Sequence, residues 1–244
     1  MPDLPRRSPQ PGTAPSPART ARRRRIGIRG VLGASGLALA ALPLLAIATA
    51  SPAVAADDTN PWSMFDRVRA ELQGKSPIGA HFVQNFIPSG FGEGEQEEGT
   101  LWISLPQCLR WDYGEPFPKS FLLCDDTAYY WNPGEPSGKR YSIENEEAPG
   151  LDFFLLTSAD LKLRYNATSE RLTDGQIHIA LEPIRPTDDV VSLEVVVDPE
   201  NDRIVELGYA DSEGNRTWFA LSDYTPGAPP GTFSPPAGVT WEDP

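Results

Sequence analysis

The 244-residue sequence is poor in the side chains on which most enzymes and metal sites depend. It contains two histidines, His81 and His178, and two cysteines, Cys108 and Cys124. The histidines lie in strand-like patterns at no spacing typical of a metal site, and no nucleophile-elbow, phosphate-loop or dinucleotide-binding pattern occurs. Acidic residues are abundant, but no two of them stand out as a catalytic pair. We therefore expect no enzyme activity, no metal and no cofactor.

The chain also lacks positive charge outside its N-terminal region. Residues 1–56 hold eight of the 21 basic residues and one of the 34 acidic residues, so residues 57–244 keep 13 basic and 33 acidic residues, a formal net charge of −20. Such a surface argues against binding to nucleic acid and to anionic membranes. It favours solubility and a partner with a basic surface.

The first 56 residues have the order typical of an export signal. Residues 1–30 are rich in proline, arginine and serine, residues 31–50 are apolar, and residues 53–55 form a small-x-small cleavage pattern. We expect cleavage near Ala55 or Ala56, which leaves residues 57–244 as a single domain in the periplasm. A membrane anchor is the alternative, because the apolar run approaches spanning length. The general and the twin-arginine export routes both stay open.

Alternating apolar patterns and turn sequences predict a mainly β domain. Asn60 is placed to cap a helix over 60–74, and a second short helix is expected over 151–160. Residues 134–150 are expected to form a polar loop. The other segments predict about nine to eleven short antiparallel strands, and such a meander curls on itself. We therefore expect an incomplete, strongly curved antiparallel β-barrel (a half-barrel) covered by two short α-helices.

A hairpin centred on Pro116 aligns the two cysteines. With the turn at 114–118, Cys108 faces Cys124 and Arg110 faces Leu122 across the ladder, and cross-strand neighbours at this separation suit a disulfide. An oxidising exported compartment permits that bond, with two unpaired thiols as the alternative. Arg110 lies among apolar residues, so its guanidinium must find acceptors. Asp112 and Glu115 are local candidates.

Several short motifs follow one another in an order that resembles a known family. They are Phe82-Val-Gln84, the EGTLW sequence at 98–102, Pro106, the LRW sequence at 109–111 and Pro116, then PGLDFFLL at 149–156, IALEP at 179–183 and FSPPAGVT at 233–240. In this order they resemble the LolA-type periplasmic carriers (chaperones) of outer-membrane lipoproteins. The resemblance covers roughly residues 78–242; the cysteine pair and the long loop at 134–150 are not part of that pattern.

The resemblance implies a role in protein transport. Such a carrier takes acylated lipoproteins from an inner-membrane lipoprotein-releasing transporter, shelters their acyl chains in an apolar cavity, and hands them to the outer membrane, where a receptor is a further expected partner. We expect it to act as a monomer. Arg110 matches the arginine that, in the family, bonds backbone carbonyls of a lid helix, here expected around 151–157. The alternatives are a carrier of another lipid or glycolipid on the same scaffold, and a lipoprotein-sensing regulatory protein.

The resemblance and the apolar patterns together nominate a set of lid and ligand-binding residues. Alternation along the hairpin places Leu109, Trp111 and Tyr113 on the face opposite Arg110, so the sequence leaves open which hairpin face lines the cavity. The nominated residues are Arg110, Leu122, Phe82, Phe86, Trp102, Trp62, Phe65, Leu151, Phe153 and Phe154.

Overall fold

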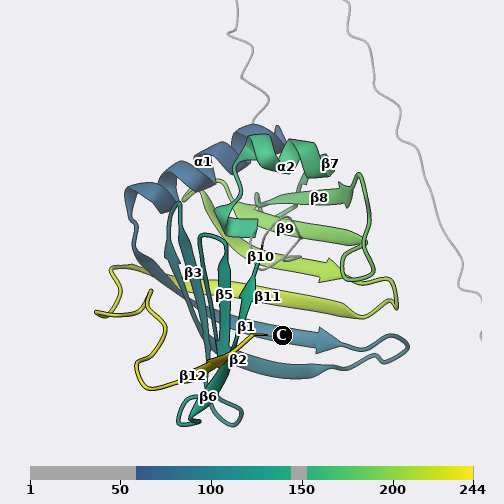
Figure 1. Ribbon diagram of the computed structural model, residues 1–244. Coiled ribbons are helices and arrows are strands. Elements are labelled where there is room, and N and C mark those ends of the chain that lie inside the picture. The colour runs from purple at the N-terminus through teal and green to yellow at the C-terminus, as the bar shows by residue number, and fades with distance from the viewer. Residues whose placement is uncertain (1–58, 144–152, 244) are drawn as a thin grey trace, which may run out of the picture. The chain divides into compact units, whose positions relative to one another are not determined.

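The fold is built on one open, curved β-sheet with helices over one face. A computed structural model describes residues 59–143 and 153–243, and within them twelve strands form this sheet (Figure 1). The helices are α1 (Pro61–Gly74), the 3₁₀-helix η1 (Phe153–Leu155) and α2 (Ser158–Arg164). The strands are β1 (Ile78–Ile87), β2 (Glu95–Ser104), β3 (Cys108–Tyr113), β4 (Ser120–Cys124), β5 (Thr127–Trp131), β6 (Ser137–Ser142), β7 (Tyr165–Arg171), β8 (Ile177–Pro183), β9 (Ser192–Asp198), β10 (Arg203–Ala210), β11 (Arg216–Pro226) and β12 (Thr240–Glu242).

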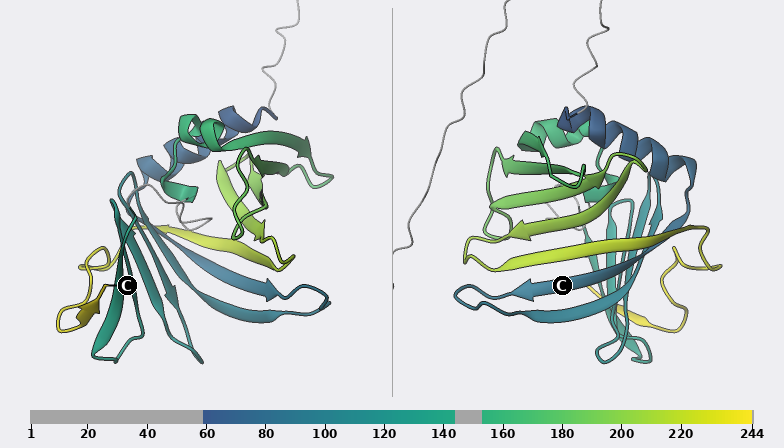
Figure 2. Two further views of the ribbon diagram at one scale, coloured as in Figure 1. Left: turned by 45° about the vertical axis from the view of Figure 1, so that its right-hand side comes forward. Right: turned by 180° about the vertical axis from the view of Figure 1, so that it is seen from behind.

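The strand order shows how the sheet stays open. It runs β12-β6-β5-β4-β3-β2-β1-β11-β10-β9-β8-β7, so β1 pairs with both β2 and β11 and brings distant parts of the sequence together. All pairings are antiparallel except the parallel pairing of β12 with β6. The sheet curves around the helices without closing, as Figure 2 shows from two sides. The prediction of a mainly β half-barrel with two α-helices is confirmed.

Helix α1 forms as the sequence predicts. The Asn60 side chain accepts hydrogen bonds from the backbone N–H groups of Trp62 and Ser63, each at 3.1 Å, and Pro61 occupies the first turn, where no intrahelical donor is needed. Its buried residues recur at helical spacing, so one stripe of the helix packs on the sheet. These residues are Met64, Phe65, Val68 and Leu72.

The helix predicted over 151–160 is wrong in its bounds. Residues 151 and 152 lie outside the described residues, η1 covers 153–155, and a separate helix α2 runs on to Arg164 in a segment predicted as strand. The reason is local: Thr157 and Asp160 form a capping box, which starts a new helix. Leu161, buried against the core, extends it. None of the described helices is long and apolar enough to cross a membrane.

The register of the β3–β4 hairpin is as predicted. Cys108 pairs with Cys124 and Arg110 with Leu122, and a disulfide joins the two cysteines, whose Cα atoms are 4.2 Å apart. The loop predicted over 134–150 is wrong in part, because β6 forms within it and pairs with β5. Strand β6 carries Lys139 and Arg140 in a polar sequence, so it lacks the apolar alternation on which strand prediction depends.

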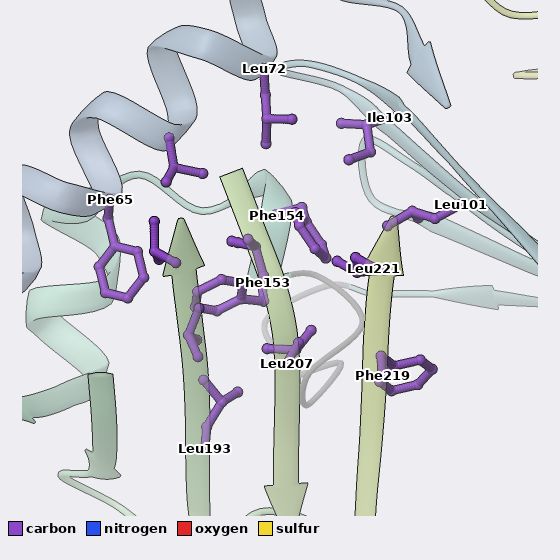
Figure 3. Packing of buried hydrophobic residues seen from close by; sticks show 14 of the residues in the cluster. Phe65, Leu72, Leu101, Ile103, Phe153, Phe154, Leu193, Leu207, Phe219 and Leu221 are labelled. Carbon is purple, nitrogen blue, oxygen red and sulfur yellow. The ribbon is translucent and has the colours of Figure 1, made fainter. Parts of the chain in front are cut away.

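The main core lies between the concave face of the sheet and the helices. Figure 3 shows side chains of α1, η1 and strands β2, β9, β10 and β11 gathering there. Phe153 packs edge-on against Phe65 of α1, with ring centroids 5.5 Å apart. Phe82 of β1 is fully buried and contacts the rings of Trp111, Tyr113 and Phe219. This half of the sheet is therefore filled by its own side chains.

Candidate functional site

An apolar pocket lies at the other end of the sheet, on β3–β6. Its volume is about 480 Å³, within the range of roughly 300–1,000 Å³ usual for ligand pockets. Its lining is mostly aliphatic and aromatic, with two lysines. The lining residues are Leu109, Trp111, Lys119, Phe121, Leu122, Leu123, Ala128, Tyr129, Tyr130, Lys139, Tyr141 and Ile143.

Cross-strand pairing arranges most of this lining in two rows. One row runs Trp111, Phe121, Tyr130 and Lys139, and the other runs Leu109, Leu123, Ala128 and Tyr141. Residues in register on adjacent strands point to the same face. Because Trp111 also contacts Phe82 and Phe219 of the core, both rows face the concave side. The apolar hairpin face opposite Arg110 therefore supplies most of the lining, and Leu122 and Tyr129, which are in register with Arg110, also border the pocket.

Most of the aromatic residues nominated from the sequence lie in the packed core. Phe65, Phe82, Phe153 and Phe154 are buried, and Trp62 packs against the same cluster. A gap between α1 and the segment after η1 measures only about 20 Å³. These residues therefore support the scaffold of the site rather than an open space. Of the nominated residues that the structure describes, Leu122 lines the 480 Å³ pocket.

Two other nominated residues, Trp102 and Phe86, lie apart from the pocket. Trp102 lies on the convex face, close over Gly79, where an added Cβ would come within 2.6 Å of the indole ring. It lines a second, more polar pocket on that face. Phe86 lies on β1 and is half-buried. Leu151 lies outside the described residues.

An arginine that the sequence analysis did not nominate holds the segment around η1. The Nη1 group of Arg69, on α1, donates to the backbone carbonyls of Leu155 and Leu156 at 2.9 and 3.0 Å, and to that of Phe154 at 3.4 Å. Carbonyls at the end of a short helix lack intrahelical donors, so a guanidinium is a suitable partner. Phe154 in turn lies 6.5 Å from the Trp111 ring, so this latch borders the pocket.

Arg110 bonds elsewhere than expected. Its Nε donates to Asp112 at 2.8 Å, and its Nη1 donates to the backbone carbonyl of Thr232 at 2.9 Å. Its guanidinium also lies 5.0 Å from the centroid of the Trp131 ring. All three partners lie on or against the convex face, so Arg110 holds the C-terminal segment 227–243 there. The local pairing with Asp112 was the alternative that the sequence left open.

The pocket has cationic groups near one rim. Lys119 pairs with Glu97 at 2.7 Å and lies over the Tyr113 ring at 4.4 Å, whereas Lys139 extends from the exposed strand β6. Burial, with a smaller contribution from Glu97, raises the pKa of the Tyr113 hydroxyl far above its ordinary value. That hydroxyl stays protonated and donates to Gln84 at 2.6 Å. The site therefore combines an apolar interior with positive charge at its edge.

Among the pocket residues that were not nominated from the sequence, only those of the β3–β4 hairpin lie in a recognisable sequence pattern. The alternation of Leu109, Trp111, Phe121 and Leu123 marks one apolar face of the hairpin, and this face lines the pocket. The contributions of β5 and β6 had no such signal, since Tyr129 and Tyr130 are adjacent aromatics and β6 is polar. Arg69 lies on an otherwise apolar helix stripe, and its target is 85–87 residues away in sequence.

Sequence comparisons with known proteins agree on one family. A profile of the family described as "Outer membrane lipoprotein carrier protein LolA" matches residues 74–234. The outer-membrane lipoprotein carrier protein of Chromohalobacter salexigens is 27% identical over 160 residues, which cover 65% of this chain and 74% of the relative. The protein of the same name from Xylella fastidiosa (strain Temecula1) is 24% identical over 180 residues, which cover 73% of this chain and 82% of the relative.

Solved structures align with this chain at low identity. An uncharacterized conserved protein from Thermus thermophilus aligns with a TM-score of 0.48 and 10% identity, covering 74% of this chain and 98% of the other. A putative outer membrane lipoprotein-sorting protein domain from Vibrio parahaemolyticus aligns with a TM-score of 0.43 and 13% identity, covering 71% of this chain and 95% of the other.

Proposed function

Since this chain belongs to the LolA family of outer membrane lipoprotein carriers, we propose that it shelters the acyl chains of lipoproteins in the β3–β6 pocket while they travel from the inner to the outer membrane. The observation that carries the proposal is the apolar pocket of about 480 Å³ on the concave face. The family is non-catalytic and periplasmic, which agrees with a carrier that binds and releases an unchanged cargo.

Sequestration supplies the affinity. Each methylene group that leaves water contributes about 0.8 kcal/mol, so even a partly enclosed acyl chain is held firmly. The aromatic rows on β3–β5 offer a broad, preformed apolar surface for such chains.

Release requires that the empty, closed form be of comparable free energy to the loaded form. Arg69 provides the closing contacts, because its three bonds to the backbone of Phe154, Leu155 and Leu156 hold this segment against α1. Because all three bonds share the two hydrogens of one nitrogen, this charge-assisted contact is worth about 1.5–3 kcal/mol as a whole. Cargo that needs the space near Trp111 competes with this latch, and the latch re-forms when the cargo leaves.

The proposed partners follow from the same cycle. The protein receives acylated lipoproteins from an inner-membrane lipoprotein-releasing transporter and delivers them to an outer-membrane receptor. The net charge of −20 in residues 57–244 favours partner surfaces that are basic, because complementary charge speeds association. We propose that the carrier works as a monomer.

A matched pair of substitutions tests the pocket. Ala128 lines the pocket, whereas Ala220 is exposed on β11, so Ala128→Glu and Ala220→Glu add the same charge in the two places. A triacylated lipopeptide should displace an apolar fluorescent probe from the wild-type protein and from Ala220→Glu. Ala128→Glu should bind it at least about tenfold more weakly, since an unpaired carboxylate near the acyl chain is costly. Equal binding by both variants would place the cargo elsewhere.

A further inference from the structure

The charge of the β3–β6 pocket is opposite in sign to the charge of the chain around it. Residues 57–244 hold 33 acidic and 13 basic residues. The described residues that line the pocket include two lysines, Lys119 and Lys139, and none of these lining residues is acidic. An apolar pocket with cations in its lining suits an amphiphile, in which an apolar chain is joined to an anionic group. Such a ligand needs a lysine whose charge is not already paired.

Lys119 is already paired. Its Nζ donates to the two carboxylate oxygens of Glu97 at 2.8 and 2.7 Å, and it lies 4.4 Å from the centroid of the Tyr113 ring. Both members of the ion pair are mostly buried. An incoming anion would have to displace Glu97 and leave its carboxylate uncompensated, which is costly. Lys119 therefore adds little net charge to the pocket.

Lys139 is available to a ligand. It is exposed on β6, and its ammonium group has no ion pair or hydrogen bond in the part of the chain that the structure describes. Register places it beside Tyr130, at the end of the row that begins at Trp111, so it follows the aromatic lining on the concave face. Glu242 of β12 is in register on its other side, and no ion pair joins the two. A cation is thus free where the apolar row ends.

We propose that Lys139 binds an anionic group next to the acyl chains of the cargo, so that the pocket prefers acylated ligands with a carboxylate or phosphate in the head group. This inference rests on the proposed function, because it adds a specificity contact to the same pocket. Two sources carry this chemistry: a lipoprotein with an acidic residue beside its acylated cysteine, and an anionic phospholipid. The negative charge of the whole protein opposes the contact only weakly, since exposed charges more than about 8 Å away are screened at physiological ionic strength.

Two pairs of ligands test this preference on the folded, processed protein. The first pair is a triacylated lipopeptide with glutamate or glutamine after the acylated cysteine. The second pair is phosphatidylglycerol and phosphatidylcholine with the same acyl chains. Dissociation constants come from displacement of an apolar fluorescent dye, with all ligands at monomeric concentrations. A partly exposed ion pair predicts that the anionic member binds about twofold to fivefold more tightly. A preference within the first pair identifies a lipoprotein source, and one within the second pair identifies a phospholipid source.

The salt dependence of these ratios is a further readout. The preference for the anionic member should shrink as the salt concentration rises from about 0.01 M to about 1 M, because the Debye length falls from about 30 Å to about 3 Å. Burial of the acyl chains affects both members of a pair equally, so it cancels in the ratio. A preference that is unchanged by salt would show that it does not come from a charge at the rim.

Substitutions on β6 assign the preference to a residue. Lys139→Gln removes the cation and should reduce the ratios to about one, whereas Lys139→Arg keeps the cation and should retain them. Arg140→Gln removes the same charge from the next residue, which points to the opposite face and pairs with Asp243, so it should keep the wild-type ratios. Because Lys139 is exposed, its variants should fold as the wild type does, which circular dichroism checks.

The possible failures are distinguishable. Tight binding of all four ligands by the wild type, with both ratios near or below one, overturns the role of Lys139 and leaves the carrier function intact. A preference that survives in Lys139→Gln, or that Arg140→Gln abolishes equally, overturns it as well. If the wild type binds none of the four ligands, the pocket is not an acyl site, and both the proposed function and this inference are wrong.

Discussion

At the residue scale, the role of each arginine depends on the face from which its side chain leaves. Arg69 leaves α1 toward the segment after η1 and bonds three backbone carbonyls. Arg110 leaves β3 on the convex side and bonds Asp112 and the backbone of Thr232. The first contact borders the pocket, and the second fixes the C-terminal segment. Both arginines donate to backbone carbonyls, but Arg69 holds the segment beside the pocket and Arg110 holds the C-terminal segment on the convex face.

Replacing Arg69 by leucine tests the latch. The change keeps an apolar stem on α1 and removes every donor, so the carbonyls of 154–156 lose their shared partner. A loss of about 1.5–3 kcal/mol from the closed form shifts a two-state equilibrium toward the open form by roughly tenfold to a hundredfold. We expect stronger binding of an apolar fluorescent dye and faster proteolysis within 153–157.

Arg110→Leu is the matched control for this experiment. It removes the same donors from the convex face, so dye binding should stay near the wild-type level while cleavage within 227–243 becomes faster. If Arg110→Leu increases dye binding and Arg69→Leu does not, the latch has been assigned to the wrong arginine.

At the scale of elements, prediction succeeded where a local signal fixed the geometry. The turn at Pro116 and the alternation on each side were enough to align Cys108 with Cys124. Asn60 and Pro61 were likewise enough to start α1. Prediction failed at β6, whose pairing with β5 and β12 comes from tertiary context. It also failed at 161–164, where the helix that starts at the capping box continues into a segment predicted as strand.

The capping box of α2 predicts a pH dependence. The Asp160 carboxylate accepts hydrogen bonds from the hydroxyl and from the backbone N–H of Thr157. These bonds, the one from the hydroxyl most of all, lower the pKa of Asp160. The folded protein therefore binds this proton less readily than the unfolded chain, whose aspartates titrate near about 3.9. The hydrogen-bonded carboxylate therefore stabilises the fold fully above the unfolded-state pKa. This stabilisation is lost as the pH falls through the lower pKa of the folded state.

A variant isolates this contribution from those of other carboxylates. The difference in free energy of unfolding between the wild type and Asp160→Asn should be largest at neutral pH and should shrink on going to about pH 3. Urea titrations followed by circular dichroism measure it. Asp66→Asn, on the exposed side of α1, controls for the loss of one charge. A difference that is constant with pH would show that ionisation of Asp160 does not stabilise the fold.

At the scale of the whole molecule, the candidate site was harder to predict than the fold. The fold class follows from strand patterns and turns, but the identity of the concave face depends on how the complete sheet curves. Alternation separated Arg110 from Trp111 without saying which of them faces inward. The pairing of β1 with β11 brings Phe82 and Phe219 together, and both contact Trp111. These contacts show that the Trp111 face of the hairpin is the concave one.

At this scale we predict that the N-terminal export signal is removed from the mature protein. Residues 1–56 carry the arginine-rich, apolar and small-residue order of an export signal, so we expect cleavage after Ala55 or Ala56. N-terminal sequencing of the protein from a periplasmic fraction measures this directly. A chain that keeps residues 1–56 and sediments with membranes would show that this segment is an anchor.

The parallel strand β12 has a consequence for polymerisation. Open sheets grow from molecule to molecule by pairing one edge with another, and head-to-tail growth needs two usable edges. Here the β6 edge is occupied by a strand of the same chain, which spans only Thr240–Glu242 and is fastened by Arg140 to Asp243 through bonds of 2.8 and 2.9 Å. The new edge is short and acidic, so it is a poor template for β7 of a second copy. We therefore expect β12 to disfavour edge-to-edge pairing of the β6 edge with the sheet of a second molecule.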